Sequence, residues 1–244
     1  MLLVSQIAGV IAIGIAVAVR GQGPGGGAIL WAIPAAISGT IGLYAFYRGI
    51  AVGAISVVAP IAGVSAIVPV TVGLATGDPP SAAQLVGIVL VLPGVALAAR
   101  EHHEGGVRLA AGVPLAALAA VGFGGYFVPM HAAGRADFWW ASLLFRATTL
   151  LMVATAALIV RSPVRMSRSD LALVAAVGIG DTLGNALYAA SSAHGLVSVT
   201  SVLASLYPVG TIVLARFVLH ERVGRSQQAG IAATLAGVVL ISAG

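Results

Sequence analysis

The side chains best suited to chemistry in this sequence lie in one stretch, residues 178–195, which reads GIGDTLGNALYAASSAHG. Asp181 is followed by Asn185, Tyr188 and Ser192 at i+4, i+7 and i+11. In an α-helix these spacings place all four side chains on one face. A carboxylate beside an amide and two hydroxyls can bind a cationic or polar ligand, and the carboxylate can also take up a proton. The spacing therefore predicts a polar stripe along one helix.

The composition predicts that this stripe lies in a membrane. Of the 244 residues, 59% are hydrophobic and 8% are charged, with a mean hydropathy of +1.07, whereas soluble domains carry about 25% charged residues. Apolar runs of the roughly 20 residues that a helix needs to cross a bilayer recur along the chain. These runs are continuous rather than alternating, which favours helices over a barrel. We therefore expect an all-α membrane protein, a polytopic helical bundle, in which a buried charge such as Asp181 costs about 2.5–3.5 kcal/mol to insert.

The apolar runs between charged or Gly/Pro breaks predict nine spans with short connections and no soluble domain. The spans lie near residues 2–19, 29–47, 55–76, 82–99, 110–131, 138–160, 171–192, 198–219 and 227–243. The loop arginines are divided unevenly, with eight on the face that holds residue 1 and two on the opposite face. The positive-inside rule then puts the eight-arginine face in the cytoplasm of a plasma (inner) membrane protein. That face includes the loops 100–109, 161–170 and 220–226.

The two halves of the sequence resemble each other. Residues 39–58 align with 181–200 at a shift of 142, which pairs Thr40 with Thr182 and Gly42 with Gly184. Residues 84–97 align with 227–240 at a shift of 143. Spans one to four pair with spans six to nine, so the fifth span lacks a partner, and we expect a tenth helix upstream of this start. An odd number of helices per repeat predicts that the second copy is inverted.

These repeated residues carry a resemblance to a known family. YRGIAVGAISVVAPIAGVSAIVPV and QLVGIVLVLPGVAL resemble the first half of an EamA-like transporter of the drug/metabolite transporter superfamily. GDTLGNALYAASSAHGLVSVTSVLASLYPVGTIVLARFVLHERV and QQAGIAATLAGVVLISAG resemble the second half. The resemblance implies two inverted five-helix repeats around a central cavity, here residues 1–100 with four visible spans and 110–244 with five. It also implies cytoplasmic termini for the ten-helix form, which places residue 1 outside and disagrees with the arginine count.

The first repeat contains a second polar stripe. Thr40, Tyr44 and Tyr47 form it, with Arg48 beside it. We expect the two stripes to line opposite sides of a substrate pathway, with Asp181 binding a cation or a coupling proton. The alternative is a structural carboxylate that bonds to a neighbouring helix.

Arg146 lies inside the sixth span, and its partner in the repeat is Gln6. A buried guanidinium could hold an anionic substrate or neutralise Asp181. The alternative is that the arginine reaches towards a membrane interface.

Small residues predict where helices approach closely in lipid. Two seven-residue spacings and one four-residue spacing of glycine fall on single helix faces, namely Gly87 with Gly94, Gly230 with Gly237, and Gly180 with Gly184. We expect these faces to pack against other helices.

The remaining motifs argue against an enzyme. The chain has no cysteine and no GxxxxGK[ST] phosphate loop, and adjacent histidines in the EHHE run at 101–104 point in different directions. The Gly-x-Gly-Asp sequence at Asp181 is found in intramembrane aspartyl proteases, but no second in-span aspartate is present. We expect no cofactor, no metal and no nucleic acid. The predicted function is secondary transport of a small polar metabolite, with proton-coupled efflux of cationic drugs or a non-transporting membrane scaffold as alternatives.

Overall fold

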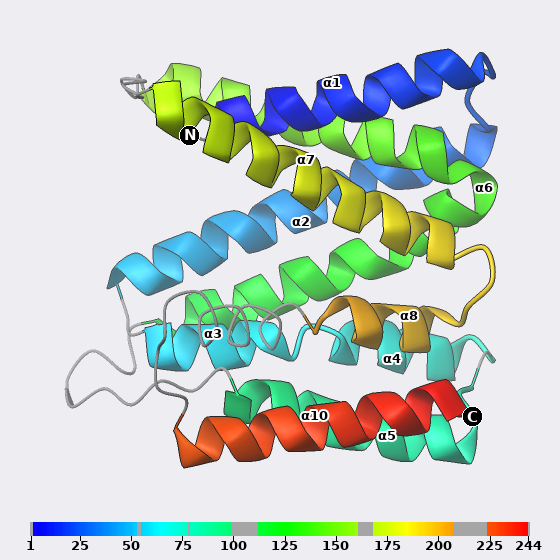
Figure 1. The fold of residues 1–244 in the computed structure, drawn as a ribbon, viewed down its shortest axis with the longest axis vertical. Coiled ribbons are helices and arrows are strands. Elements are labelled where there is room, and N and C mark those ends of the chain that lie inside the picture. The colour runs from blue at the N-terminus through cyan, green and yellow to red at the C-terminus, as the bar shows by residue number, and fades with distance from the viewer. Residues whose placement is uncertain are drawn as a thin grey trace. The chain divides into compact units, whose positions relative to one another are not determined.

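The computed structural model describes residues 2–52, 55–77, 79–98, 112–160, 168–206 and 224–243. Within these ranges the regular structure is helical, and no strand is formed. Four of the described helices are long and apolar enough to cross a membrane, and they start at Leu2, Gly26, Val113 and Asp170. The helices divide into two compact units (Figure 1), residues 1–40 with 128–194 and residues 41–127 with 195–244. Each unit contains helices from both predicted repeats.

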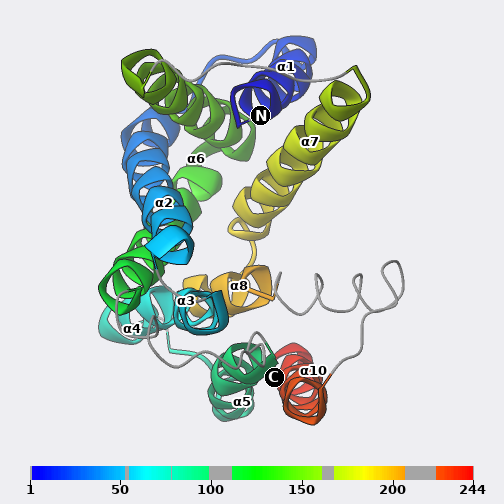
Figure 2. The same cartoon turned by 90° about the vertical axis from the view of Figure 1, so that its left-hand side faces the viewer.

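The first unit is built around helices α1 (Leu2–Arg20) and α7 (Arg168–Ser191). These two helices lie side by side (Figures 1 and 2). Glycine allows the approach, because a Cβ atom on Gly178 would overlap the backbone of Ser5. The unit also contains the first part of α2 (Gly26–Val52) and the second part of α6 (Val113–Val160).

Helix α1 shows how the sequence separates a packed face from an apolar outer face. Gln6, Gly9, Ile13 and Val17 are buried at helical spacing. The opposite face exposes large apolar side chains, namely Ile7, Ile11, Ile15 and Val19. An exposed face of this kind is suited to lipid rather than water.

Helix α6 is two helices joined at Asp137. This residue has φ −168° and ψ 100°, an extended conformation within a 48-residue run. Its carboxylate accepts hydrogen bonds from the backbone N–H groups of Trp139 at 3.1 Å and Trp140 at 3.3 Å, which makes Asp137 the N-cap of the second helix. The break therefore falls between the fifth and sixth predicted spans.

The second unit contains helices α3 (Ile55–Gly63), α4 (Ile67–Ala75), α5 (Ala82–Ala98), α8 (Val197–Ala204) and α10 (Arg225–Ala243). Helix α5 lies along α10, and α4 packs against α8 (Figures 1 and 2). A cluster of buried apolar residues joins these helices, and its members are Ala66, Val70, Ile88, Val91, Val95, Val202 and Ile241.

The third predicted span is not one continuous helix. The chain turns at residues 64–66, so α3 and α4 are separate helices. Pro69 lies in the first turn of α4, where a backbone N–H would have no partner within the helix, so no helix hydrogen bond is lost. The proline is therefore tolerated at this helix start.

Helices α5 and α10 cross at glycine pairs. A Cβ on Gly87 would lie 2.6 Å from the carbonyl oxygen of Gly237, and a Cβ on Gly237 would lie 2.6 Å from that of Gly87. A Cβ on Gly94 would lie 3.0 Å from the carbonyl oxygen of Gly230. Because the earlier residue of one helix meets the later residue of the other, the two helices run antiparallel.

Candidate functional site

The centre of the candidate site is the guanidinium of Arg146. Its Nη2 lies 2.7 Å from Oδ2 of Asp181, and its Nη1 donates a hydrogen bond of 3.0 Å to Oε1 of Gln6. The Arg146 side chain is 2% exposed, whereas the Asp181 side chain is 55% exposed. The positive group is thus enclosed by protein, and the carboxylate forms the accessible side of the pair.

Three helices supply this centre. Gln6 comes from α1, Arg146 from the second part of α6, and Asp181 from α7. Gly9 is one turn beyond Gln6, and a Cβ there would overlap the hydroxyl of Thr182 and lie 3.4 Å from Cδ of Arg146. The absence of that Cβ is what allows α1 to approach α7 at the level of the ion pair.

The guanidinium retains hydrogen-bonding capacity. Nε and Nη2 of Arg146 are buried, and neither has a hydrogen-bond acceptor with good geometry among the described residues. The short contact from Nη2 to Asp181 is therefore an ionic contact without an aligned hydrogen bond. A guanidinium has five N–H donors, and a buried charge is costly unless these donors are used. Two of its nitrogens are therefore without an acceptor within the described part of the chain.

The remaining residues of the α7 stripe extend from this centre. Asn185 Nδ2 donates to the backbone oxygen of Asp181 at 2.7 Å and lies 3.3 Å from Oδ1 of the same residue. Tyr188 and Ser192 are buried, and the Ser192 hydroxyl donates to the Tyr188 carbonyl at 3.1 Å. The carboxylate is thus held by Asn185 on its own helix and by Arg146 across the helix contact.

Most residues of the first-repeat stripe belong to the other unit. The side chains of Tyr44, Tyr47 and Arg48 are exposed, and the hydroxyl of Thr40 is buried without a hydrogen-bond partner among the described residues. The two tyrosines and Arg48 belong to the second unit, whereas Asp181 belongs to the first. That the two stripes face one pathway remains a prediction.

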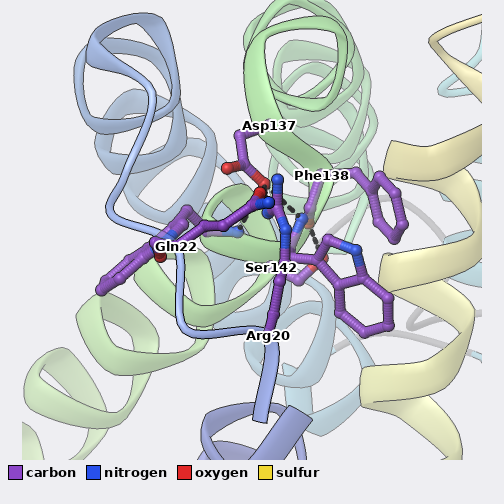
Figure 3. A network of polar contacts seen from close by, with 7 residues as sticks. Arg20, Gln22, Asp137, Phe138 and Ser142 are labelled. Atoms are coloured by element: carbon purple, nitrogen blue, oxygen red, sulfur yellow. Dashed lines mark hydrogen bonds and ion pairs between the residues drawn. The ribbon is translucent and has the colours of Figure 1, made fainter. Parts of the chain in front are cut away.

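A second polar network lies in the first unit (Figure 3) and was not expected from the sequence. Arg20 Nη1 donates to Oδ1 of Asp137 at 2.6 Å, and the Asp137 side chain is 7% exposed. Trp140 Nε1 donates to the backbone oxygen of Gln22 at 2.8 Å. An aspartate directly before an apolar run is a typical N-cap signature, and it could have indicated this position. The network ties the end of α1 to the start of the second helix of α6.

The glycines predicted to pack helices have different surroundings. Gly87, Gly94, Gly230 and Gly237 lie in the α5–α10 contact. A Cβ on Gly180 or Gly184 would meet no atom within 4 Å. The α7 face that carries these two glycines is not covered by another described helix.

The described residues contain no group of three or more potential metal ligands from His, Cys, Asp and Glu. The EHHE run at 101–104 and three of the predicted arginine loops lie wholly or partly outside the described residues.

Comparison with known proteins gives a family and a fold. The sequence model of the EamA-like transporter family matches residues 110–243. No curated protein matches the sequence. A solved crystal structure of a protein is similar over 99% of this chain and 86% of that chain, with 18% sequence identity and a TM-score of 0.78.

Proposed function

Because the chain belongs to the EamA-like transporter family of the drug/metabolite transporter superfamily, we propose that it is a secondary transporter. It is an integral membrane protein of a family of transporters. The proposed activity is the movement of a small polar metabolite across the membrane by alternating access. A gradient of an ion or of a substrate would drive it. The plasma (inner) membrane is the proposed location, with the arginine-rich loop face in the cytoplasm.

The observation that carries this proposal is the site of Gln6, Arg146 and Asp181. Intramembrane charges are expensive, and where they occur they commonly mark substrate or ion pathways. Here a guanidinium that is 2% exposed faces a carboxylate that is 55% exposed, on helices whose outer faces are apolar. A packing role alone would not require the carboxylate to remain accessible.

The glycine contact between α5 and α10 supports the proposed inverted repeats. Gly87 and Gly94 correspond in the sequence repeat to Gly230 and Gly237. Gly87 meets Gly237 and Gly94 meets Gly230, so each helix presents the same positions to the other. Two antiparallel helices related by a two-fold axis meet in this way. Inverted repeats of this kind support alternating access by rocking around a central site.

The ion pair suggests how a ligand would be recognised. A cationic group or a proton at Asp181 would compete with Arg146 for the carboxylate, and an anionic group would compete with Asp181 for the guanidinium. Either event breaks the existing pair and leaves one of its two charges without a counterion in a poorly solvated site, which costs free energy. Binding at such a site can therefore be reversible.

Proton-coupled efflux of cationic compounds is the second candidate function. The exposed side chain of Asp181 favours it, because a cation reaching the site meets the carboxylate before the buried arginine. A non-transporting scaffold would need no accessible ionic site at all.

The proposal is tested by counterflow in vesicles. Purified protein is reconstituted, loaded with individual amino acids, amines, organic acids or nucleosides, and assayed for exchange with and without a proton gradient. Asp181→Asn is compared with Asp170→Asn, which makes the same change in the first turn of the same helix. We expect exchange of at least one solute, lost in Asp181→Asn and kept in Asp170→Asn. Absence of exchange for every class would support the scaffold, and stimulation of cation efflux by a proton gradient would favour the second candidate.

A further inference from the structure

The helices that form the ionic site contain two charged residues within their apolar lengths, Arg146 and Asp181. The other charged residues of α1, α7 and the second part of α6 lie at helix ends, namely Arg20, Asp137, Arg168 and Asp170. Nη2 of Arg146 lies 2.7 Å from Oδ2 of Asp181, so the two in-span charges cancel. The site therefore carries no net charge when no ligand is bound.

Neutral groups meet this ion pair from the neighbouring elements. Helix α1 presents Gln6, whose Oε1 accepts a hydrogen bond from Arg146, and Gly9, where a Cβ would lie 3.4 Å from Cδ of Arg146. On α7, Asn185 Nδ2 lies 3.3 Å from Oδ1 of Asp181. The other titratable side chains on this face of α7 are about two turns away or further, namely Asp170 and Tyr188. Among the described residues of these helices, Arg146 is thus the group that balances the carboxylate.

The contact between the two charges can be exchanged for another. Nη2 of Arg146 has no hydrogen-bond acceptor with good geometry among the described residues, so ionic attraction holds Asp181 without an aligned hydrogen bond. Two further contacts hold the guanidinium independently of the carboxylate. Nη1 donates to Gln6 at 3.0 Å, and Cζ lies 5.8 Å from the centroid of the Phe145 ring, within the range of a cation–π interaction. A ligand can therefore displace Arg146 from Asp181 while the guanidinium keeps its other partners.

We propose that Arg146 is an internal cation that occupies the place of a coupling ion at Asp181. The proposal rests on the proposed transport function and concerns what drives it. A carboxylate without a counterion is costly inside a membrane. A carrier with Asp181 alone would therefore have to bind a proton or another cation before the empty site could change its direction of access. With Arg146 in contact, the empty site is neutral and needs no such ion, so net transport would follow the substrate gradient alone.

Removal of the arginine should create the requirement for an ion. Arg146→Gln leaves Asp181 as the one in-span charge of the three helices. At neutral pH the empty site then carries a negative charge, which slows its return across the membrane. At lower pH a proton can neutralise Asp181 in place of the guanidinium, and the empty site can return again. A purely structural role of Arg146 would not give a loss of net transport that acid restores.

The first test measures net efflux from proteoliposomes. Vesicles are loaded with each solute of the counterflow panel and diluted into solute-free buffer, with equal pH on both sides. We expect wild type to release the transported solute without a proton gradient. Arg146→Gln should release it at least about tenfold more slowly at neutral pH, and should recover when the pH is lowered on both sides. Arg146→Gln combined with Asp181→Asn should not respond to acid, and Arg20→Gln, which breaks the other ion pair, should behave like wild type.

A second test needs no transported solute. Arg146→Gly leaves a space of guanidinium size beside Asp181, and methylguanidinium is the probe for that space. We expect methylguanidinium to raise the melting temperature of Arg146→Gly in detergent, relative to choline at the same concentration. The double variant Arg146→Gly with Asp181→Asn should show no such shift, because the carboxylate that holds the cation is gone.

Three outcomes would overturn the proposal. The first is wild-type net efflux that requires a proton gradient or a second ion, which would mean that Arg146 does not replace the coupling ion. The second is an Arg146→Gln variant whose net efflux equals that of wild type, or whose loss acid does not restore. The third is an equal shift by methylguanidinium in Arg146→Gly and in the double variant, or no shift in either. The third readout is independent of transport, so it is distinguishable from a failure of the proposed function, which would be seen as no counterflow of any solute.

Discussion

Gln6 accepts a hydrogen bond from Arg146, 140 residues away, and the sequence repeat predicts that these two residues occupy corresponding positions in its two halves. Two corresponding positions related by a two-fold axis can touch each other only near that axis. On the proposed inverted repeat, the ionic site therefore lies where the two halves meet. Sites of secondary transporters with inverted repeats commonly lie at such an interface.

Removal of the Asp181 charge should destabilise the first unit. Asp181→Asn leaves the buried guanidinium of Arg146 without its counterion. We expect a loss of about 1–3 kcal/mol, between the values for exposed and for fully buried ion pairs, because the carboxylate is partly exposed. Thermal unfolding in detergent measures this, with Asp170→Asn as the matched control. An unchanged melting temperature would show that the ion pair contributes nothing to stability.

A carboxylate at residue 6 should compensate for that loss. Gln6→Glu places an acidic oxygen where Gln6 Oε1 already accepts a hydrogen bond from Arg146 at 3.0 Å. In the Asp181→Asn background we expect Gln6→Glu to recover most of the lost stability, whereas Gln6→Met should recover none. Recovery by both variants would mean that packing rather than charge was restored. If transport stays absent in the stabilised double variant, the role of Asp181 in binding is separated from its role in folding.

The Arg20–Asp137 pair should contribute separately from the helix cap. Asp137→Asn keeps an oxygen for the N–H groups of Trp139 and Trp140 but removes the charge that Arg20 contacts. Asp137→Ala removes both, and we expect an additional loss of about 1 kcal/mol for the cap. A double-mutant cycle with Arg20→Gln measures the ion pair alone. Equal stability of the Asn and Ala variants would rule out the cap.

The crossing of α5 and α10 should not tolerate a single added methyl group. A Cβ on Gly87 or Gly237 would lie 2.6 Å from a backbone oxygen, which cannot move without shifting a helix. We expect Gly87→Ala and Gly237→Ala each to cost about 1–3 kcal/mol. Gly180→Ala meets no atom within 4 Å and should be neutral or stabilising by up to about 1 kcal/mol, since alanine favours helix. Equal effects at all three positions would contradict the close contact.

Hydropathy was sufficient to predict the helical class and most helix positions, because a backbone in lipid must bond to itself. The prediction of helix positions from hydropathy fails where the chain turns within an apolar run or where a single residue ends a helix. A turn at residues 64–66 divides the predicted third span into α3 and α4, and hydropathy does not reveal it. Asp137 ends one helix and caps the next within α6. Hydropathy marks this position only as a gap between two predicted spans.

The candidate site was only partly predictable for a similar reason. Helical spacing groups Asp181 with Asn185 on one face, and the structure joins them by hydrogen bonds. Spacing within one helix cannot give a contact between helices. The repeat alignment paired Gln6 with Arg146, but their hydrogen bond depends on how closely α1 approaches α6 and α7. The Arg20–Asp137 pair connects residues 117 apart, and no local pattern contains it.

The crossing of α5 and α10 also constrains how this protein can change over evolutionary time. Gly87 and Gly237 each lie against the backbone of the other, although they descend from different positions of the duplicated unit. A larger residue at one of these positions fits only if the backbone of the opposite helix moves away at that point. Because glycine is already the smallest residue, no substitution at one position can make room for a larger residue at the other. We therefore expect the two halves to have diverged freely on their outer faces while both positions remain glycine across relatives.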